Sequence, residues 1–324
     1  MLKNLPDISK QISSKEILSA LNKNYSIIVP VWIPMQSEWM NNLYRTFNDY
    51  DKFMIIIHVL LKTFDFYSKN FVKLNYQEYF DQSEIEIKEI NIMEISNSLN
   101  IPKETARRKV NELEELGAIK RIKKKIIIDR KTWPSIKPKD TLKRMSHFLS
   151  IFSKILRNDK VMSESFTSDE IIITAKENFS YIWKLYFEMQ MSMLLSFKKI
   201  YGNLETFHVH GICLSNEALN SKKIDNSKMD RKFYLEEYFY SHKKSFTGIN
   251  GMSISEISGI PRATVIRKLN RLIKKKFLTR DIKKHYSTTG NHIAKLSAVQ
   301  NNTFNNLSLF AERIYNLCLI KTNN

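Results

Sequence analysis

Arginine, lysine, asparagine and threonine side chains recur at one spacing in two parts of the chain, where they could bind a nucleic acid. Residues 101–113 read IPKETARRKVNEL, and residues 260–272 read IPRATVIRKLNRL. Seven of these thirteen positions are identical at an offset of 159 residues. Basic groups neutralise phosphates, and short polar side chains reach the edges of bases. The pattern therefore predicts two binding units in one chain.

Other reactive side chains form no catalytic pattern. The sequence contains no phosphate-binding glycine loop, no HExxH zinc motif and no GxSxG nucleophile motif. His208 and His210, with Glu205 and Cys213 nearby, would converge on a metal if they lay on a strand, but on a helix they point to different faces. Cys213 and Cys318 are too few for a metal cluster or a disulfide framework, which favours buried free thiols. We expect no enzyme activity, no metal and no cofactor.

The residues before and within each copy of the pattern predict two helices joined by a tight turn. Residues 93–99 form a short helix with its apolar positions on one face. Asn100 follows it, and Gly259 stands at the same place in the second copy. Both residue types tolerate the left-handed backbone that such a turn needs. The prolines that come next suit the first turn of a following helix.

The second helix of each copy is expected to be amphipathic and to be followed by a basic hairpin. Its apolar face is formed by Ala106, Val110 and Leu113 in the first copy and by Val265, Leu269 and Leu272 in the second. Residues 119–128 read as two β-prone arms around a triple-lysine tip, and 277–280 and 286–289 read as a second hairpin. The candidate DNA-binding residues on these elements are Lys103, Thr105, Arg107, Arg108, Asn111, Arg121, Lys123, Lys124, Lys125, Arg262, Thr264, Arg267, Asn270, Arg271, Arg280, Lys283 and Lys284.

The positive charge is concentrated on these candidate elements. The whole chain has a net charge of +19, of which residues 103–131 carry +6 and residues 262–284 carry +9. Such clusters dominate the affinity for nucleic acids, because each neutralised phosphate releases counterions. The charge favours an anionic partner, with nucleic acid ahead of an anionic membrane surface.

The similarity of the two parts extends to their surroundings and indicates a duplicated chain. Aromatic-rich helical stretches precede both copies, at 39–67 and 179–203, and amphipathic helices follow them, at 141–157 and 303–319. Polar stretches at 158–169 and 216–232 are expected to be loops. We divide the chain into residues 1–158, with a first helix-turn-helix core at 90–131, and residues 159–324, with a second core at 250–289. Scarce glycine and proline favour a mainly α fold with small β-wings, in which the remaining helices form a pseudo-dimer core.

A helix-turn-helix followed by a basic hairpin resembles the winged helix-turn-helix domains of bacterial transcription regulators, most closely those of the MarR type. The resemblance covers roughly 92–128 and 251–287, and it implies a regulator that places the second helix of each unit in the major groove of DNA. MarR-type proteins are shorter chains that pair as homodimers, whereas two copies are fused here. This chain is therefore expected to be a monomer with an internal pseudo-dimer, or a homodimer.

Sequence-specific binding of double-stranded DNA by a cytoplasmic, nucleoid-associated transcription regulator is the function we expect. The N-terminus lacks the apolar region of a signal peptide, and no apolar run is long enough to span a bilayer. The two units differ. Ile266 stands where the first copy has Arg107, which predicts unlike half-sites. Arg271 and Lys274 stand where the first copy has Glu112 and Glu115, so the second unit has fewer repelling carboxylates, and we expect a larger contribution from Arg267 than from Arg108. One alternative is a plasmid- or phage-type replication initiator, and another is a winged-helix scaffold that binds protein. The aromatic stretches are expected to form core, with a pocket for a small-molecule effector as the open alternative.

Overall fold

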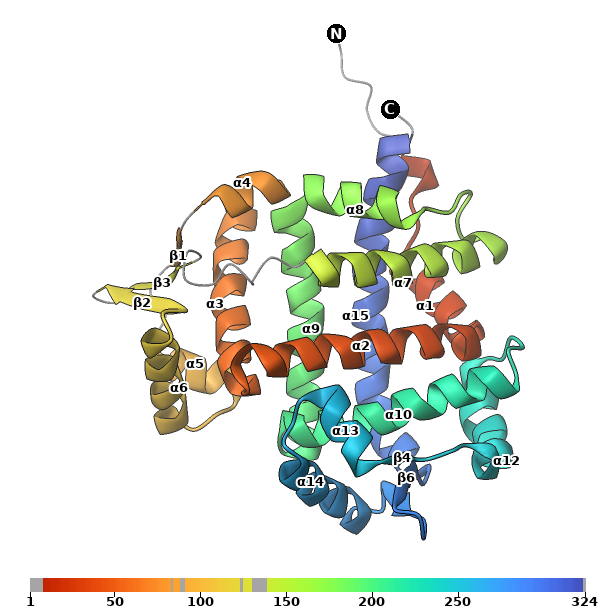
Figure 1. Cartoon of the computed structure of the whole chain (residues 1–324). Helices are drawn as coiled ribbons and strands as arrows, with labels where there is room; N and C mark the ends of the chain where they lie inside the picture. Colours follow the sequence, from red (N-terminus) through yellow and green to blue (C-terminus); the bar gives the residue numbers. More distant parts are fainter. Residues whose placement is uncertain (1–7, 83, 88–90, 123–124, 130–138, 323–324) are drawn as a thin grey trace.

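The chain is mainly helical and carries two small antiparallel sheets, as the sequence predicts (Figure 1). The structure is a computed structural model, and it describes residues 8–82, 84–87, 91–122, 125–129 and 139–322. Within these residues the elements of the first part of the chain recur, in the same order, in the second part.

The first series of elements runs from a short 3-10 turn to a long amphipathic helix. Its members are η1 (Ile8–Lys10), α1 (Ser14–Lys23), α2 (Tyr25–Phe47), α3 (Tyr50–Lys69), α4 (Tyr76–Asp81), β1 (Glu84–Ile87), α5 (Ile92–Leu99), α6 (Lys103–Glu115), β2 (Ile119–Ile122), β3 (Lys125–Asp129) and α7 (Lys139–Asn158).

The second series repeats this order with one longer helical connection. Its members are α8 (Ser168–Glu177), α9 (Phe179–Tyr201), α10 (Leu204–Ile224), α11 (Arg231–Phe233), the π-helical turn η3 (Tyr234–Tyr238), α12 (Phe239–His242), η4 (Lys243–Ser245), β4 (Ile249–Asn250), α13 (Gly251–Ser258), α14 (Arg262–Lys274), β5 (Leu278–Arg280), β6 (His285–Thr288) and α15 (Asn291–Thr322).

The same capping chemistry opens the first helix of each series. The Ser13 hydroxyl accepts from the backbone of Glu16, whose carboxylate in turn accepts from the backbone of Ser13. Thr167 and Glu170 form the same reciprocal pair at the start of α8. A capping box satisfies two backbone donors that a helix start leaves unpaired. The hydrogen bonds to Ser13 hold the pKa of Glu16 below its usual value.

Two expectations about helix limits were wrong. The stretch 39–67 is broken between α2 and α3, where Asn48 takes a left-handed conformation (φ 51°) and Asp49 caps the next helix. The stretch 216–232 is not a loop as a whole, because α10 continues through Ile224. Glu217 and Ser221 are buried on the inner side of that extension. The sequence did not predict this part of the helix, because two residues on its buried side, Glu217 and Ser221, are polar.

The two series of helices are interlocked. Helix α2 packs along α10, and α3 packs along α9 (Figure 1). In the same way α1 packs on α15, and α7 packs on α8. Each of these pairs joins one helix from the first series to one from the second, so one continuous hydrophobic core spans both.

Hydrogen bonds between the series come in matching pairs. The backbone N–H of Ser26 donates to the carbonyl of Met229 at 3.2 Å, and the Ser26 hydroxyl accepts from the N–H of Met229 at 2.8 Å. Ser180 makes the same two contacts with Leu74, each at 3.0 Å. Ser26 lies at the start of α2, and its partner Met229 follows the end of α10. Ser180 lies at the start of α9, and its partner Leu74 follows the end of α3. Contacts are thus exchanged in both directions.

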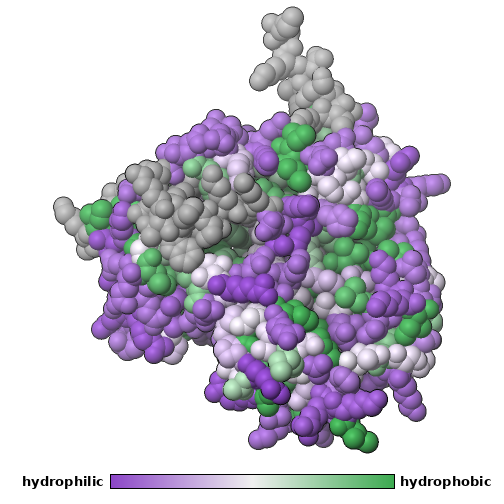
Figure 2. Space-filling view, in the orientation of Figure 1, coloured by the Kyte–Doolittle hydropathy of each residue, from purple (hydrophilic) through white to green (hydrophobic). Residues whose placement is uncertain are grey.

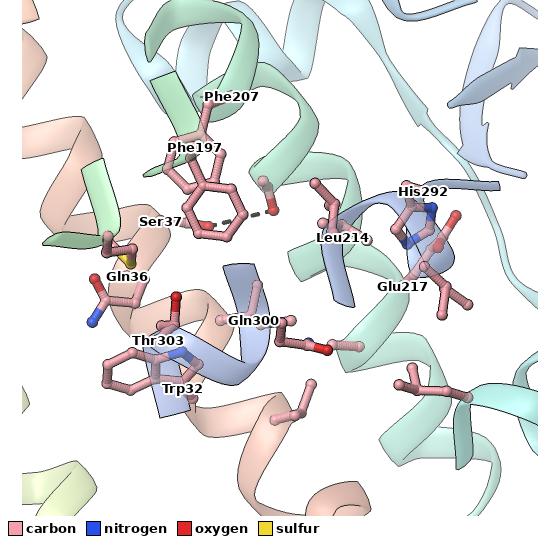
Figure 3. Close-up of a pocket in the computed structure, with 18 of the residues that line it drawn as sticks. Trp32, Gln36, Ser37, Phe197, Phe207, Leu214, Glu217, His292, Gln300 and Thr303 are labelled. Atoms are coloured by element: carbon pink, nitrogen blue, oxygen red, sulfur yellow. Dashed lines mark hydrogen bonds between the residues drawn. The ribbon is translucent and has the colours of Figure 1, made fainter. Parts of the chain in front are cut away.

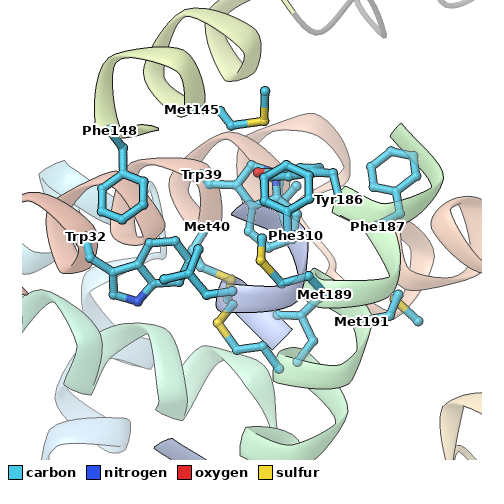
Figure 4. Close-up of a cluster of buried hydrophobic side chains, with 14 of the residues drawn as sticks. Trp32, Trp39, Met40, Met145, Phe148, Tyr186, Phe187, Met189, Met191 and Phe310 are labelled. Carbon is cyan, nitrogen blue, oxygen red and sulfur yellow. The ribbon is translucent and has the colours of Figure 1, made fainter. Parts of the chain in front are cut away.

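Aromatic side chains fill the centre of the molecule, as predicted (Figure 4). The ring of Trp39 lies 6.2 Å from that of Tyr186, edge to face, and Tyr186 lies 5.8 Å from Phe310. Trp32 contacts Phe148 with ring centroids 5.2 Å apart. These rings come from α2, α7, α9 and α15, so the aromatic stretches hold the two series together.

Each sheet has three strands, in the orders β1-β3-β2 and β4-β6-β5. The hairpins β2–β3 and β5–β6 confirm the predicted basic hairpins, with Ile119 opposite Ile128 and Leu278 opposite Thr288. The outer strands β1 and β4 were not anticipated. Strand β4 has two residues, too short for a pattern to reveal.

Both cysteines are buried, and within the described residues neither forms a disulfide, as expected. Among the described helices, none combines the length and the apolar character needed to cross a bilayer.

Candidate nucleic-acid interface

The turns between α5 and α6 and between α13 and α14 have matching geometry. Asn100 (φ 49°) and Gly259 (φ 73°) both take the left-handed conformation, which confirms the prediction for these positions. In the first turn the Ser96 hydroxyl donates to the carbonyl of Ile101 at 2.7 Å. In the second, Ser255 makes the same bond to Ile260 at 2.7 Å. A serine one turn before the helix end therefore fixes each turn.

The apolar faces of α6 and α14 are buried, as predicted. These faces consist of Ala106, Val110 and Leu113 in α6 and of Val265, Leu269 and Leu272 in α14, and all six side chains are fully buried. Pro102 and Pro261 stand at the N-cap, directly before the first turn, near which they were expected. The opposite faces of both helices are exposed to solvent.

A lysine shared by both copies faces inward and anchors each helix. The Nζ of Lys109 lies 2.5 Å from a carboxylate oxygen of Asp49, the N-cap of α3. The Nζ of Lys268 lies 2.8 Å from the side-chain oxygen of Asn203, the N-cap of α10. Sequence reasoning did not single out this role, because a lysine on a basic helix is normally assigned to the solvent face.

The partners of the two lysines differ in charge: Asp49 has a carboxylate, whereas Asn203 has a neutral amide. Burial opposes protonation of Lys109, but the hydrogen bonds and charges of Asp49 and Glu112 outweigh it and raise the pKa of Lys109. Burial lowers the pKa of Lys268, whose only acidic partner within the described residues is Glu205 at 3.5 Å. Glu112 also binds Lys52 at 2.8 Å, so it belongs to this inner network rather than to the outer face.

The candidate residues of α6 are exposed but partly engaged with carboxylates. Lys103, Arg107, Arg108 and Asn111 are exposed, and Thr105 is half-buried. The guanidinium of Arg107 lies 3.3 Å from Glu104, and that of Arg108 lies 3.6 Å from Glu112.

Arg121 of strand β2 is held most firmly. Its Nε donates to Glu114 at 2.7 Å, and its Nη2 donates to Glu114 and, at 3.0 Å, to the side-chain oxygen of Asn111. The side-chain hydrogen bond from Arg121 holds the pKa of Glu114 below its usual value. Two candidates, Arg121 and Asn111, thus bind each other in the first unit.

The second unit leaves its candidate residues uncompensated. Arg262, Arg267, Asn270 and Arg271 of α14 are exposed, and so are Arg280, Lys283 and Lys284 in the hairpin; Thr264 is half-buried. Within the described residues, no ion pair involves any of these arginines and lysines. Ile273 stands where the first copy has Glu114, so Arg280 lacks the acid that holds Arg121. The structure thus assigns the larger free positive charge to the second unit.

Three candidates of the first hairpin cannot be placed fully. Lys123 and Lys124 lie outside the described residues, and of Lys125 only the backbone, paired with Ile122 in the hairpin, is described. Ile266, the counterpart of Arg107, is half-buried, and its side chain packs close to Gly251 in α13. The outer faces of α6 and α14 therefore differ at this position.

Each helix pair is also held by the opposite series. The guanidinium of Arg45, from α2, donates to the carbonyls of Glu256 and Ile257 at 3.3 and 3.1 Å, near the end of α13. The Nζ of Lys198, from α9, donates to the carbonyl of Leu99 at the end of α5. Cations at helix C-termini complement the helix dipole. These crossed contacts couple the positions of the two units.

Helix α6 lies at the left edge of the molecule and α14 at its bottom in Figure 1, both on the outside of the long helices. Mainly hydrophilic residues cover that edge (Figure 2). Both helices lie on the outside of the helical core, but only α14 is basic, with five basic and no acidic residues, whereas α6 has four of each.

The histidine pair does not form a metal site. His208 is buried between Tyr50, which contacts its Nδ1, and Asn41, whose side-chain oxygen lies 2.7 Å from its Nε2. His210 binds the hydroxyl of Tyr201 at 2.6 Å. Within the described chain, no three His, Cys, Asp or Glu side chains are placed to hold a metal ion.

Comparisons with protein-family models, with curated proteins and with solved structures gave no match to this chain.

Proposed function

We propose that the chain is a sequence-specific double-stranded DNA-binding regulator, built as a fused pair of winged helix-turn-helix units. Helices α6 and α14 are the groove-binding helices, and the hairpins β2–β3 and β5–β6 are the wings. The observation that carries the proposal is the outer face of α14, where Arg262, Arg267 and Arg271 are exposed and free of acidic partners within the described residues. Such a face binds phosphates and guanine edges in the major groove.

The exchanged contacts support the pseudo-dimer part of the proposal. In a two-fold dimer, residue i of one subunit contacts residue j of the other, and j contacts i in return. The pairs Ser26–Met229 and Ser180–Leu74 have this relation, and so do the pairs α2–α10 and α9–α3. The chain thus supplies within itself the interface that a homodimer would form, and it binds DNA as a monomer.

The two half-sites are unlike. The first unit offers Arg107 and Arg108 beside carboxylates, whereas the second offers Arg267 and Arg271 alone. The second unit therefore contributes more of the phosphate-driven affinity.

The test is a titration of duplex DNA selected from a random pool, over a range of salt concentrations. Arg267→Ala should weaken binding by about 1–3 kcal/mol and reduce the salt slope by about one unit. Arg108→Ala should have a smaller effect, since Glu112 already lies 3.6 Å from that guanidinium. Lys15→Ala is the control, because Lys15 is exposed on α1, far from α14 in Figure 1.

Two results would contradict the proposal. Selection of a perfect palindrome would exclude binding by two unlike units of one chain, and binding without salt dependence would exclude the phosphate contacts. Recovery of iterated origin repeats that the protein melts would favour the replication initiator instead.

A further inference from the structure

The tip of the second wing, residues 281–284 between β5 and β6, carries an apolar side chain that lies entirely in solvent. Ile282 has an exposed fraction of 101%, the highest among the large apolar residues that the structure describes. Single apolar residues are common on protein surfaces, so exposure alone does not define a site. Ile282 is distinguished by the rigidity of the tip that presents it and by the charges beside it.

Hydrogen bonds hold the tip in one shape. The N–H of Asp281 donates to the carbonyl of His285 at 3.0 Å, and the N–H of Lys284 donates to the carbonyl of Asp281 at 3.1 Å. The Asp281 side chain accepts from the N–H of His285 at 2.8 Å, and Lys284 takes the left-handed conformation (φ 63°) that closes the turn. Ile282 therefore projects from an ordered turn, and little further ordering is needed when it binds a partner.

The base of the wing is fixed to the core. Leu278 and Tyr286 are buried where the two strands pair. The backbone N–H and the hydroxyl of Thr288 donate to the carboxylate of Glu217 in α10, each at 2.6 Å. Strand β5 packs on α14, and the wing lies next to that helix at the bottom of Figure 1. The tip thus has a set position relative to the proposed groove-binding helix.

Positive charge without acidic partners surrounds the tip. The basic side chains beside Ile282 are exposed and form no ion pair within the described residues; they are Arg280, Lys283 and Lys284. Asp281 is the one acidic residue of the tip, and its carboxylate is turned toward His285, whose Nδ1 lies 3.4 Å away. An apolar side chain among free cations suits duplex DNA, which presents stacked bases between two rows of phosphates.

The duplication provides an internal comparison. At the offset of 159 residues, Lys123 stands where the second wing has Ile282. Four residues connect β5 to β6, whereas two separate β2 from β3, and both of these are lysines. A hairpin of this kind therefore does not require an apolar residue in its connection. The apolar tip is a property of the second unit alone.

We propose that Ile282 is a wedge that enters the minor groove beside α14, inserts between two neighbouring base pairs and kinks the duplex at that step. Lys283 and Lys284 bind the phosphates next to the opened step. This inference rests on the proposed DNA binding, and it specifies the DNA further. Pyrimidine–purine steps such as TA and CA unstack most easily, so the preferred site has such a step under the second wing and needs none under the first.

The bend of the DNA tests the wedge directly. A duplex selected from a random pool, with a fluorescent donor and acceptor at its two ends, reports bending as a rise in energy transfer. The intact protein should bend this duplex by about 20–90°, and Ile282→Ala should lose most of the bend. Ile173→Ala is the matched control, because Ile173 is exposed on α8, at the opposite end of the molecule from α14 in Figure 1.

Salt dependence separates the wedge from the phosphate contacts. Ile282→Ala removes no charge, so it should leave the salt slope of binding unchanged, whereas Lys283→Ala should reduce that slope by about one unit. An adenine analogue that fluoresces on unstacking, 2-aminopurine, is placed at each adenine of the selected duplex in turn. One pyrimidine–purine step, toward one end of the site, should respond, and Ile282→Ala should abolish the response.

The outcomes distinguish the wedge from the proposed function. Salt-dependent binding of a duplex that stays straight, or a bend that Ile282→Ala retains, would overturn the wedge and leave DNA binding in place. Absence of salt-dependent binding to any duplex would overturn both. Unstacking at both ends of the site would contradict the assignment of the wedge to one wing.

Discussion

Acidification from about pH 7 to about pH 5 should destabilise the folded chain through histidines that the core keeps neutral. His208 is enclosed by Tyr50 and Asn41, which pair with both ring nitrogens of a neutral imidazole. Burial lowers its pKa to about 3, and burial lowers that of His292 to about 4. Burial also lowers the pKa of His210 well below its usual value.

The size of the effect follows from these values. In the unfolded chain a histidine titrates near pH 6.5, so at pH 5 it is protonated there but neutral in the folded state. A lowered folded-state pKa contributes stability that is present above about pH 6.5 and is lost as the pH falls below it. Each of His208 and His292 then lowers the free energy of unfolding by about 2 kcal/mol between pH 7 and pH 5. Together they account for about 4 kcal/mol, a large fraction of the stability of a typical domain.

Urea unfolding followed by circular dichroism, at both pH values, measures this loss. His208→Gln should reduce the pH-dependent loss by about 2 kcal/mol, because the variant has one titrating group fewer. His147→Gln is the control, since His147 is exposed. Burial raises the pKa of Glu217, so acidification relieves the cost of its buried charge and stabilises the fold. Comparing the parent with the histidine variants separates the contribution of His208 from this opposite effect. If His208→Gln loses as much stability as the parent on acidification, the neutral-histidine explanation is wrong.

Three further predictions concern single positions. Glu114→Gln should raise DNA affinity more than Glu115→Gln in the same titration, because both remove one negative charge but only the first releases Arg121; equal gains would show that the Arg121 contact is irrelevant. Glu217→Gln should increase the free energy of unfolding at neutral pH, because burial raises the pKa of Glu217 and the folded state thus disfavours its charge above that pKa; a decrease in urea unfolding would contradict this. Gly259→Ala should lower the free energy of unfolding by about 1–2 kcal/mol, since an alanine at φ 73° is strained and its Cβ lies 3.3 Å from the Arg45 side chain, and an unchanged melting temperature would refute it.

The helix pairs could be predicted from the sequence because their signals are local. The turn residues Asn100 and Gly259 and the apolar positions at i, i+4 and i+7 act within about fifteen residues of chain. The same holds for the first hairpin, where two isoleucine-containing, β-prone arms flank a triple-lysine tip.

The remaining features depend on contacts between distant residues. Nothing near Lys109 in the sequence indicates that its partner is Asp49, sixty residues earlier, and the same is true of Lys268 and Asn203. A pocket was an open alternative from the sequence, but local patterns could not place it, because the wall of the pocket that includes Trp32 and Phe207 comes from helices of both series (Figure 3). Strand β4 is defined by its pairing with β6, which is distant in the sequence.

Because Ser26 and Met229, like Ser180 and Leu74, are covalently joined through one backbone, their association does not weaken when the protein is diluted. A cell could maintain this assembly with very few copies, without the subunit exchange that limits separate protomers. A single chain also allows each position to change independently of its counterpart. For example, residue 211 is glycine whereas its counterpart, residue 57, is isoleucine. Such a difference affects one part of the molecule, whereas in a symmetric dimer every substitution appears twice.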